Sequence, residues 1–185
     1  THMRNEDDRL LGAIEEALHV GRLANVPVQI SHLKAQGQRN YWKAQAALEL
    51  IEQASADGLD VHFDRYPYTA YATGLSNLFP SEYRAGGNQA FLNRLRDSEY
   101  ASRLEKACRE KVALLGDWNS VQISSTGAST SWARGGLVGD LARARGIEAY
   151  DLTLELLEEN GGSVGMIGHG MSEENTAKIL AHPLG

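Results

Sequence analysis

Cysteine is nearly absent from this sequence of 185 residues, in which Cys108 is the only one. A single cysteine excludes disulfides within the chain, and with them a fold held together by disulfides. Long hydrophobic runs are also missing, because no stretch of about 18 apolar residues is present that would span a bilayer. The start of the chain lacks a signal-peptide pattern. These absences predict a cytoplasmic protein with no membrane partner.

An excess of positive charge is lacking as well. The formal net charge is -6, and residues of both signs are mixed along the chain. Proteins that bind nucleic acid gather Lys and Arg on one face, so we expect no nucleic-acid partner. Hydrophobic residues make up 42% of the sequence, which is enough to bury a core.

Apolar residues recur in two alternating patterns along the chain. Leu10, Ile14 and Leu18 follow a helical spacing that predicts a helix over about 8–24. Short β-branched runs predict strands, and Gly, Asp or Ser residues mark where the helices end or begin. Strands are expected at 26–30, 59–64, 121–124 and 163–167, and further helices at about 44–57, 91–96, 100–115, 137–145, 152–159 and after Ser172.

Strand followed by helix, repeated, is typical of an α/β protein with a parallel sheet. The sequence therefore predicts about four parallel strands, which would form either part of a TIM barrel or a small open sheet. The strand pattern disappears between about 75 and 116, where we expect a helical insertion. Residues 125–136 are rich in Gly, Ser and Thr and are typical of a loop that carries binding groups.

Functional side chains in such folds lie at the carboxyl ends of the strands, and His32 and Tyr66 both follow a predicted strand. Lys34 comes two residues after His32, so an extended chain would place both on the same side. A metal-binding imidazole beside a cation suits hydrolytic chemistry. A histidine at a strand end also has an ordinary reading as a structural or polar residue.

His2 has two readings. A Thr-His-Met start is typical of a remnant of an expression vector, which would carry no function. Such a remnant does not explain why Arg4, Asn5 and Glu6 follow at once.

The other polar candidates each have a functional and an ordinary interpretation. His62 and His169 are weaker candidates for metal ligands, whereas His19 and His182 are expected on helix surfaces. Cys108 is expected to pack in a helical stripe. Glu6 and Asp64 either orient a ligand imidazole or are ordinary surface acids. Carboxylate-binding or plain surface roles remain open for Arg4, Arg65 and Arg134.

Five segments of the chain form an ordered series of motifs. They are Thr1-His2-Met3-Arg4-Asn5-Glu6, Ile30-Ser31-His32-Leu33-Lys34, Tyr66-Pro67-Tyr68-Thr69-Ala70, Met171-Ser172-Glu173-Glu174 and Ile179-Leu180-Ala181-His182-Pro183. Together they resemble successive motifs of the N-acyl-D-amino-acid deacylase (D-aminoacylase) family of the amidohydrolase superfamily, in the family's order and with about its spacing.

This resemblance implies a zinc-dependent enzyme that hydrolyses the amide bond of N-acyl-D-amino acids, with a small-molecule substrate. It implies that residues 1–185 form part of a TIM-barrel domain, from the end of the fourth strand to just before the last. His2 and His32 would be zinc ligands, and Lys34 and Tyr66 would line the substrate. Ala72 departs from the family, which often has a serine there that contacts substrate.

The resemblance also implies that parts of the active site lie outside the sequence. The family's paired histidines and its cysteine ligand would precede Thr1, and its general-base aspartate would follow Gly185. The isolated chain is therefore expected to be inactive and to associate with itself through open barrel edges. Two alternatives remain: a cyclic-amide hydrolase of the dihydroorotase or hydantoinase type, and an inactive domain that only binds or supports a partner.

Overall fold

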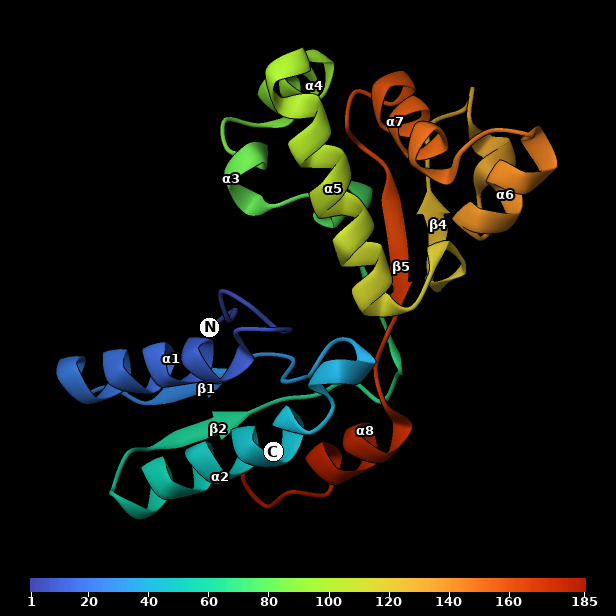
Figure 1. The fold of residues 1–185 in the computed structure, drawn as a ribbon. Helices are drawn as coiled ribbons and strands as arrows, with labels where there is room; N and C mark the ends of the chain where they lie inside the picture. Colours follow the sequence, from blue (N-terminus) through green and yellow to red (C-terminus); the bar gives the residue numbers. More distant parts are fainter. The chain divides into compact units, whose positions relative to one another are not determined.

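A computed structural model describes residues 1–185, and the chain divides into two compact units (Figure 1). Unit 1 contains Thr1–Thr69 and Gly170–Gly185, and unit 2 contains Ala70–His169. The helical insertion expected at about 75–116 falls within unit 2. No helix in the structure is long and apolar enough to cross a membrane.

Unit 1 is built on two parallel strands, β1 (Val28–Ile30) and β2 (Val61–Phe63). In both strands the outer residues are buried and the middle one is exposed, so Gln29 and His62 lie on the uncovered face. The buried side packs on α1 (Leu10–Ala24) and α2 (Lys43–Ala56), which also pack on each other. This sheet therefore has one face in the core and one face open.

The helices of unit 1 form where the sequence predicts them. Leu10, Ile14 and Leu18 of α1 are buried, and the helix ends at Asn25, which is left-handed with φ 51° and ψ 51°. After α2, Gly58 takes a positive φ of 94°, which glycine adopts without strain. The last helix of the unit is α8 (Glu173–Leu180), and its N-cap is Ser172.

Short segments extend the sheet of unit 1 on both sides. The Thr1 amino group donates to the carbonyl of Gln29, and the Ser31 amide donates to the carbonyl of Thr1 at 3.0 Å. At the other edge, the Phe63 amide donates to the carbonyl of Leu184 at 3.1 Å. The chain thus returns to the sheet after each of α1, α2 and α8, with neighbouring segments in chain order.

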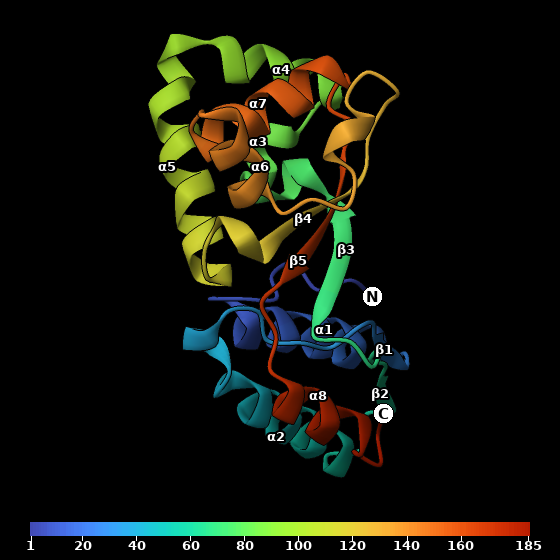
Figure 2. The same ribbon diagram turned by 90° about the vertical axis from the view of Figure 1, so that its right-hand side faces the viewer.

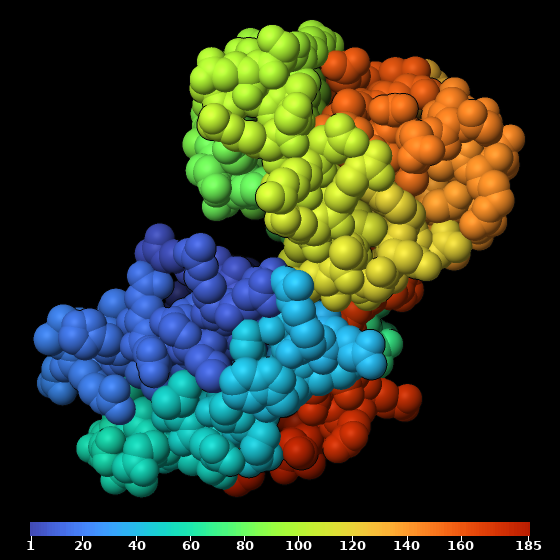
Figure 3. Space-filling view, viewed as in Figure 1, coloured from blue at the N-terminus to red at the C-terminus, as the bar shows by residue number.

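Unit 2 has a separate three-stranded sheet in the order β3-β5-β4, and Figure 2 shows β3 and β4 with β5. The strands are β3 (Ala70–Gly74), β4 (Val121–Ser125) and β5 (Gly165–His169), and both pairings are antiparallel. The helices are α3 (Ser81–Arg84), α4 (Asn88–Arg96), α5 (Ser98–Leu115), α6 (Val138–Arg145) and α7 (Ala149–Glu159). In the space-filling view, α5 and the α6–α7 region form much of this unit's visible surface (Figure 3).

The α/β class is confirmed, but the prediction of about four parallel strands is wrong in part. Only β1 and β2 are parallel, five strands are present, and no closed barrel forms. The two strands predicted at 121–124 and 163–167 pair antiparallel with each other. The strand that the sequence did not predict is β3, in which only Tyr71 is buried. It lacks the apolar run from which the other strands were predicted.

Candidate metal centre

A polar cluster gathers at the carboxyl ends of the strands of unit 1. His2 follows directly on Thr1, which pairs with β1, and His32 lies two residues after the end of β1. His32 Nε2 and His2 Nδ1 are 2.5 Å apart, with ring centroids 4.5 Å apart. The structure therefore brings the two predicted ligands together with one nitrogen of each ring directed at the other.

The backbone at His32 is unusual. His32 has φ of 45°, in the left-handed region that only a few per cent of residues other than Gly occupy. Its amide donates to Asp64 Oδ1 at 2.7 Å, and Asp64 Oδ2 accepts from Gln29 Nε2 at 3.0 Å. A carboxylate from the end of β2 thus fixes the turn that presents His32.

Glu6 joins the side chains behind His32. Its Oε1 is 2.8 Å from His32 Nδ1 and 2.5 Å from Lys34 Nζ. Its Oε2 accepts from Gln36 Nε2 at 2.8 Å, and the Gln36 amide donates to the Glu6 carbonyl at 2.8 Å. One carboxylate therefore holds three side chains of the segment 32–36.

Lys34 is almost fully buried, with 4% of its side chain exposed. Burial lowers the pKa of Lys34, whereas the adjacent Glu6 raises it. Burial also lowers the pKa of His32, and the nearby Lys34 charge lowers it further. Besides Glu6, the Lys34 ammonium lies 2.8 Å from both the carbonyl oxygen and Nδ1 of His32.

Tyr66 lies beside this cluster. The Lys34 ammonium is 5.5 Å from the centroid of its ring, and the Arg65 guanidinium is 4.5 Å from it. The Tyr66 hydroxyl is buried and forms no well-directed hydrogen bond within the chain. Burial raises the pKa of this phenol, so it keeps its proton and remains a hydrogen-bond donor.

Arg65 has a bracing role that the sequence did not indicate. Its Nη2 donates to the carbonyl of Tyr68 at 2.8 Å and to Thr176 Oγ1, on α8, at 2.9 Å. Burial lowers the pKa of Arg65. The side chain thus links the segment after β2 to α8.

The remaining histidines and arginines of unit 1 lie in ordinary places. His62 is exposed and pairs with Asp60 at 3.4 Å, and Arg4 pairs with Glu16 at 2.8 Å. His19 is exposed, as expected. The surface prediction for His182 is wrong, because only 10% of its side chain is exposed: it packs on Phe63 and pairs with Glu52 at 3.0 Å.

In unit 2, His169, Arg134 and Ala72 are all exposed. The Gly, Ser and Thr rich loop is tied down by Asn160, whose Oδ1 accepts from the Gly127 amide at 2.6 Å. Thr130 in this loop is fully buried. Asn160 is therefore a structural anchor of this loop.

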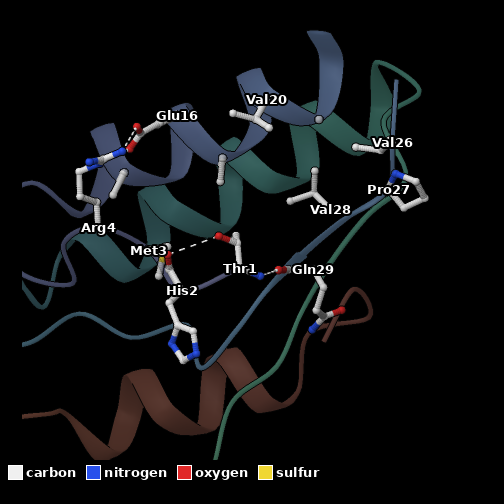
Figure 4. Close-up of a pocket in the computed structure, with 13 residues that line it drawn as sticks. Thr1, His2, Met3, Arg4, Glu16, Val20, Val26, Pro27, Val28 and Gln29 are labelled. Carbon is white, nitrogen blue, oxygen red and sulfur yellow. Dashed lines mark hydrogen bonds and ion pairs between the residues drawn. The ribbon is translucent and has the colours of Figure 1, made fainter. Parts of the chain in front are cut away.

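A groove of about 450 Å³ runs beside the first residues of unit 1 (Figure 4). It lies between α1 and β1, with apolar walls from Val20, Val26 and Val28 and the Arg4–Glu16 pair at one end. His2 also lines the groove, and in the close-up its imidazole points away from α1. The groove and the histidine pair therefore share His2.

The two imidazoles offer half of a metal site. Two nitrogens bound to one tetrahedral zinc at about 2.0–2.1 Å lie about 3.3 Å apart, so this pair would need to open by about 1 Å. No group of three His, Cys, Asp or Glu residues in the chain is arranged to hold a metal ion. The donor type fits zinc, but two donors are fewer than the three protein ligands of a typical catalytic zinc site.

No family model matches the chain. Among curated proteins it is similar to the D-aminoacylase of Alcaligenes xylosoxydans xylosoxydans, with 47% identity over 75 residues. The match covers 40% of this chain and 15% of that protein.

Several solved structures match almost the whole chain. One is an N-acyl-D-glutamate deacylase from Bordetella bronchiseptica complexed with zinc and a phosphonate inhibitor, with a TM-score of 0.71, 23% identity and 99% of this chain covered. Another is a D-aminoacylase, with a TM-score of 0.66, 29% identity and 98% covered. The chain spans 30% and 29% of these two proteins. The resemblance to the N-acyl-D-amino-acid deacylase family, predicted from the sequence motifs, is thereby confirmed.

Proposed function

We propose that this chain is a segment of a longer, zinc-dependent N-acyl-D-amino-acid deacylase. The enzyme would add water across the amide bond and release a carboxylate and a free D-amino acid. The observation that carries the proposal is the convergence of His2 Nδ1 and His32 Nε2 at 2.5 Å, backed by Glu6 and Lys34. The confirmed family resemblance supports the same reaction class.

His2 and His32 would hold the zinc, together with ligands supplied by the rest of the enzyme. Neutral imidazole is a common zinc ligand, and the solved deacylase with a similar fold carries zinc. When bound, the ion would act as a Lewis acid toward the substrate carbonyl and the attacking water. With only two such donors, the 185-residue chain alone is expected to bind zinc weakly and to be inactive.

Lys34 and Tyr66 would serve the substrate. The Lys34 ammonium and the Tyr66 hydroxyl, which has no hydrogen-bond partner within the chain, can both donate hydrogen bonds. Such donors suit a carbonyl oxygen that gains negative charge, or a substrate carboxylate. Removing one such donor in comparable sites costs about 2.7–4 kcal/mol of transition-state stabilisation. The proposal includes three further points. Residues 1–185 would form part of a TIM-barrel domain, from the end of the fourth strand to just before the last. The enzyme would be cytoplasmic, and the isolated chain would associate with itself.

The test is a chiral product assay on the full-length enzyme. The enzyme is incubated with racemic N-acetyl amino acids and zinc, and the enantiomer released is identified. We expect D-amino acids only, with the activity lost in His32→Ala and kept in the matched variant His19→Ala, whose histidine is exposed on α1. Turnover of dihydroorotate or hydantoin with no amino acid released would reject the deacylase in favour of a cyclic-amide hydrolase.

A further inference from the structure

Glu6 occupies a position that the proposed reaction does not explain by itself. Its carboxylate pairs with both His32 and Lys34. Its side chain is 18% exposed, and its backbone is fixed by the Gln36 amide. The preceding Asn5 accepts from the amides of Asp7 and Arg9, which anchors this turn to the start of α1.

The His32 ring is held at both nitrogens. Nδ1 faces Glu6 Oε1 at 2.8 Å, while Nε2 faces His2 Nδ1 at 2.5 Å. The Asp64 carboxylate fixes the His32 backbone through the amide, but it does not reach the ring. If Nε2 binds an ion, the Glu6 carboxylate at Nδ1 is the acidic group that still contacts the ring. It would then determine the orientation of the ring.

We propose that Glu6 is a positioning residue that orients the His32 imidazole so that Nε2, and not Nδ1, is presented beside His2. This inference rests on the proposed function only in taking the ligand of these nitrogens to be a zinc ion. Carboxylates behind metal-binding imidazoles commonly fix ring orientation, and their loss typically weakens metal binding by about 10–100-fold.

Lys34 complicates a simple substitution of Glu6. Its Nζ also lies 2.8 Å from His32 Nδ1, so Lys34 is a rival anchor for the ring. Glu6→Gln alone would leave a buried ammonium without its carboxylate, which is strongly destabilising. The useful comparison is therefore K34M, in which Glu6 keeps its contacts with Gln36 Nε2 and His32 Nδ1, against the double variant E6Q/K34M, in which both charges are removed.

The first readout needs no metal. NMR relaxation of the His32 ring in the 185-residue chain reports ring order, and the His182 ring, held by Glu52, is an internal control. We expect an ordered His32 ring, with an order parameter of about 0.8, in the wild type and in K34M. In E6Q/K34M we expect it to fall below about 0.6, while E16Q on α1 behaves as the wild type.

The second readout is zinc affinity of the full-length enzyme, measured by competition with a chelator. E6Q/K34M is expected to bind zinc about 10–100-fold more weakly than K34M, with E6D/K34M between the two because a carboxylate one methylene shorter only partly reaches the ring. An unchanged His32 ring in E6Q/K34M would overturn the positioning role. A ring that loses order in an enzyme whose wild type binds no zinc would instead reject the proposed metal function and keep the role of Glu6.

Discussion

The thiol of Cys108 shows what burial does to a single reactive group. Cys108 is fully buried on α5, and burial raises its pKa to about 12. At pH 8 only about one side chain in ten thousand is then ionised, and the thiolate is the reactive form. We expect native chain to react with a disulfide reagent at least about 100-fold more slowly than chain in denaturant.

This measurement has a single signal, because the sequence contains no other cysteine. Equal rates for native and denatured chain would contradict the burial of Cys108. The raised pKa also determines how the reaction rate of the native thiol changes with pH. The native rate should keep rising well above pH 9, whereas the denatured rate levels off near the ordinary thiol pKa of about 8.5.

At the same scale, the sequence pointed to the residues of the site but left two roles open for Glu6. His32, Lys34 and Tyr66 follow predicted strands, so their proximity could be expected from strand ends alone. Glu6 precedes α1, and its role depends on the turn at His32, which is left-handed because the Asp64 carboxylate caps the His32 amide. Such a contact across strands has no local sequence signal.

Among the helices, α8 offers a clean test of capping. Ser172 Oγ accepts from the Asn175 amide at 3.2 Å, as the Ser-Glu-Glu sequence indicated. Ser172→Ala removes this acceptor and is expected to lower the free energy of unfolding of unit 1 by about 1 kcal/mol, measured by urea denaturation. Ser102→Ala, exposed within α5, is the control and should be neutral or slightly stabilising. A loss as large in the control would count against the cap.

The loop at 125–136 depends on one side chain of α7's C-cap. Asn160 Oδ1 accepts from the Gly127 amide, and its Nδ2 donates to the Leu156 carbonyl at 2.7 Å and to Thr130 Oγ1 at 2.9 Å. Asn160→Ala removes these three hydrogen bonds and should destabilise unit 2 by about 1–3 kcal/mol in urea unfolding. Asn160→Asp keeps the acceptor and should cost less than the alanine variant. If both variants unfold like the wild type, the loop is anchored elsewhere.

The sequence failed to predict a strand where backbone pairing with a neighbouring strand, and not a local pattern of apolar residues, defines it. The helices of α1, α2, α5 and α8 could be found because apolar residues recur at helical spacing and capping residues end them. In β3 every residue pairs with β5 through the backbone, from Ala70 with His169 to Gly74 with Gly165. Backbone pairing of this kind is independent of side-chain type, so alternation of strand and helix alone suggested a parallel sheet.

At the scale of the whole chain, unit 2 is a continuous segment with its own core. Residues 70–169 contain a complete sheet, and β5, the last strand in sequence, lies at its centre. Domains of about 50–200 residues commonly fold independently when they bury a core of their own. Buried side chains come from every part of this unit, including Leu75, Phe79, Phe91, Leu104, Ile123, Leu152 and Met166.

We therefore expect a peptide of residues 70–169 to fold alone and unfold cooperatively, as followed by circular dichroism and dispersed amide NMR signals. Residues 70–160 make a matched control, because they lack β5 and leave β3 and β4 without the strand that joins them. Asn160→Ala should cost the same free energy in the 70–169 peptide as in the complete chain, since all its contacts lie within unit 2. A disordered 70–169 peptide would show that unit 2 requires unit 1 for its stability. The two units would then differ in their internal contacts but would not fold independently.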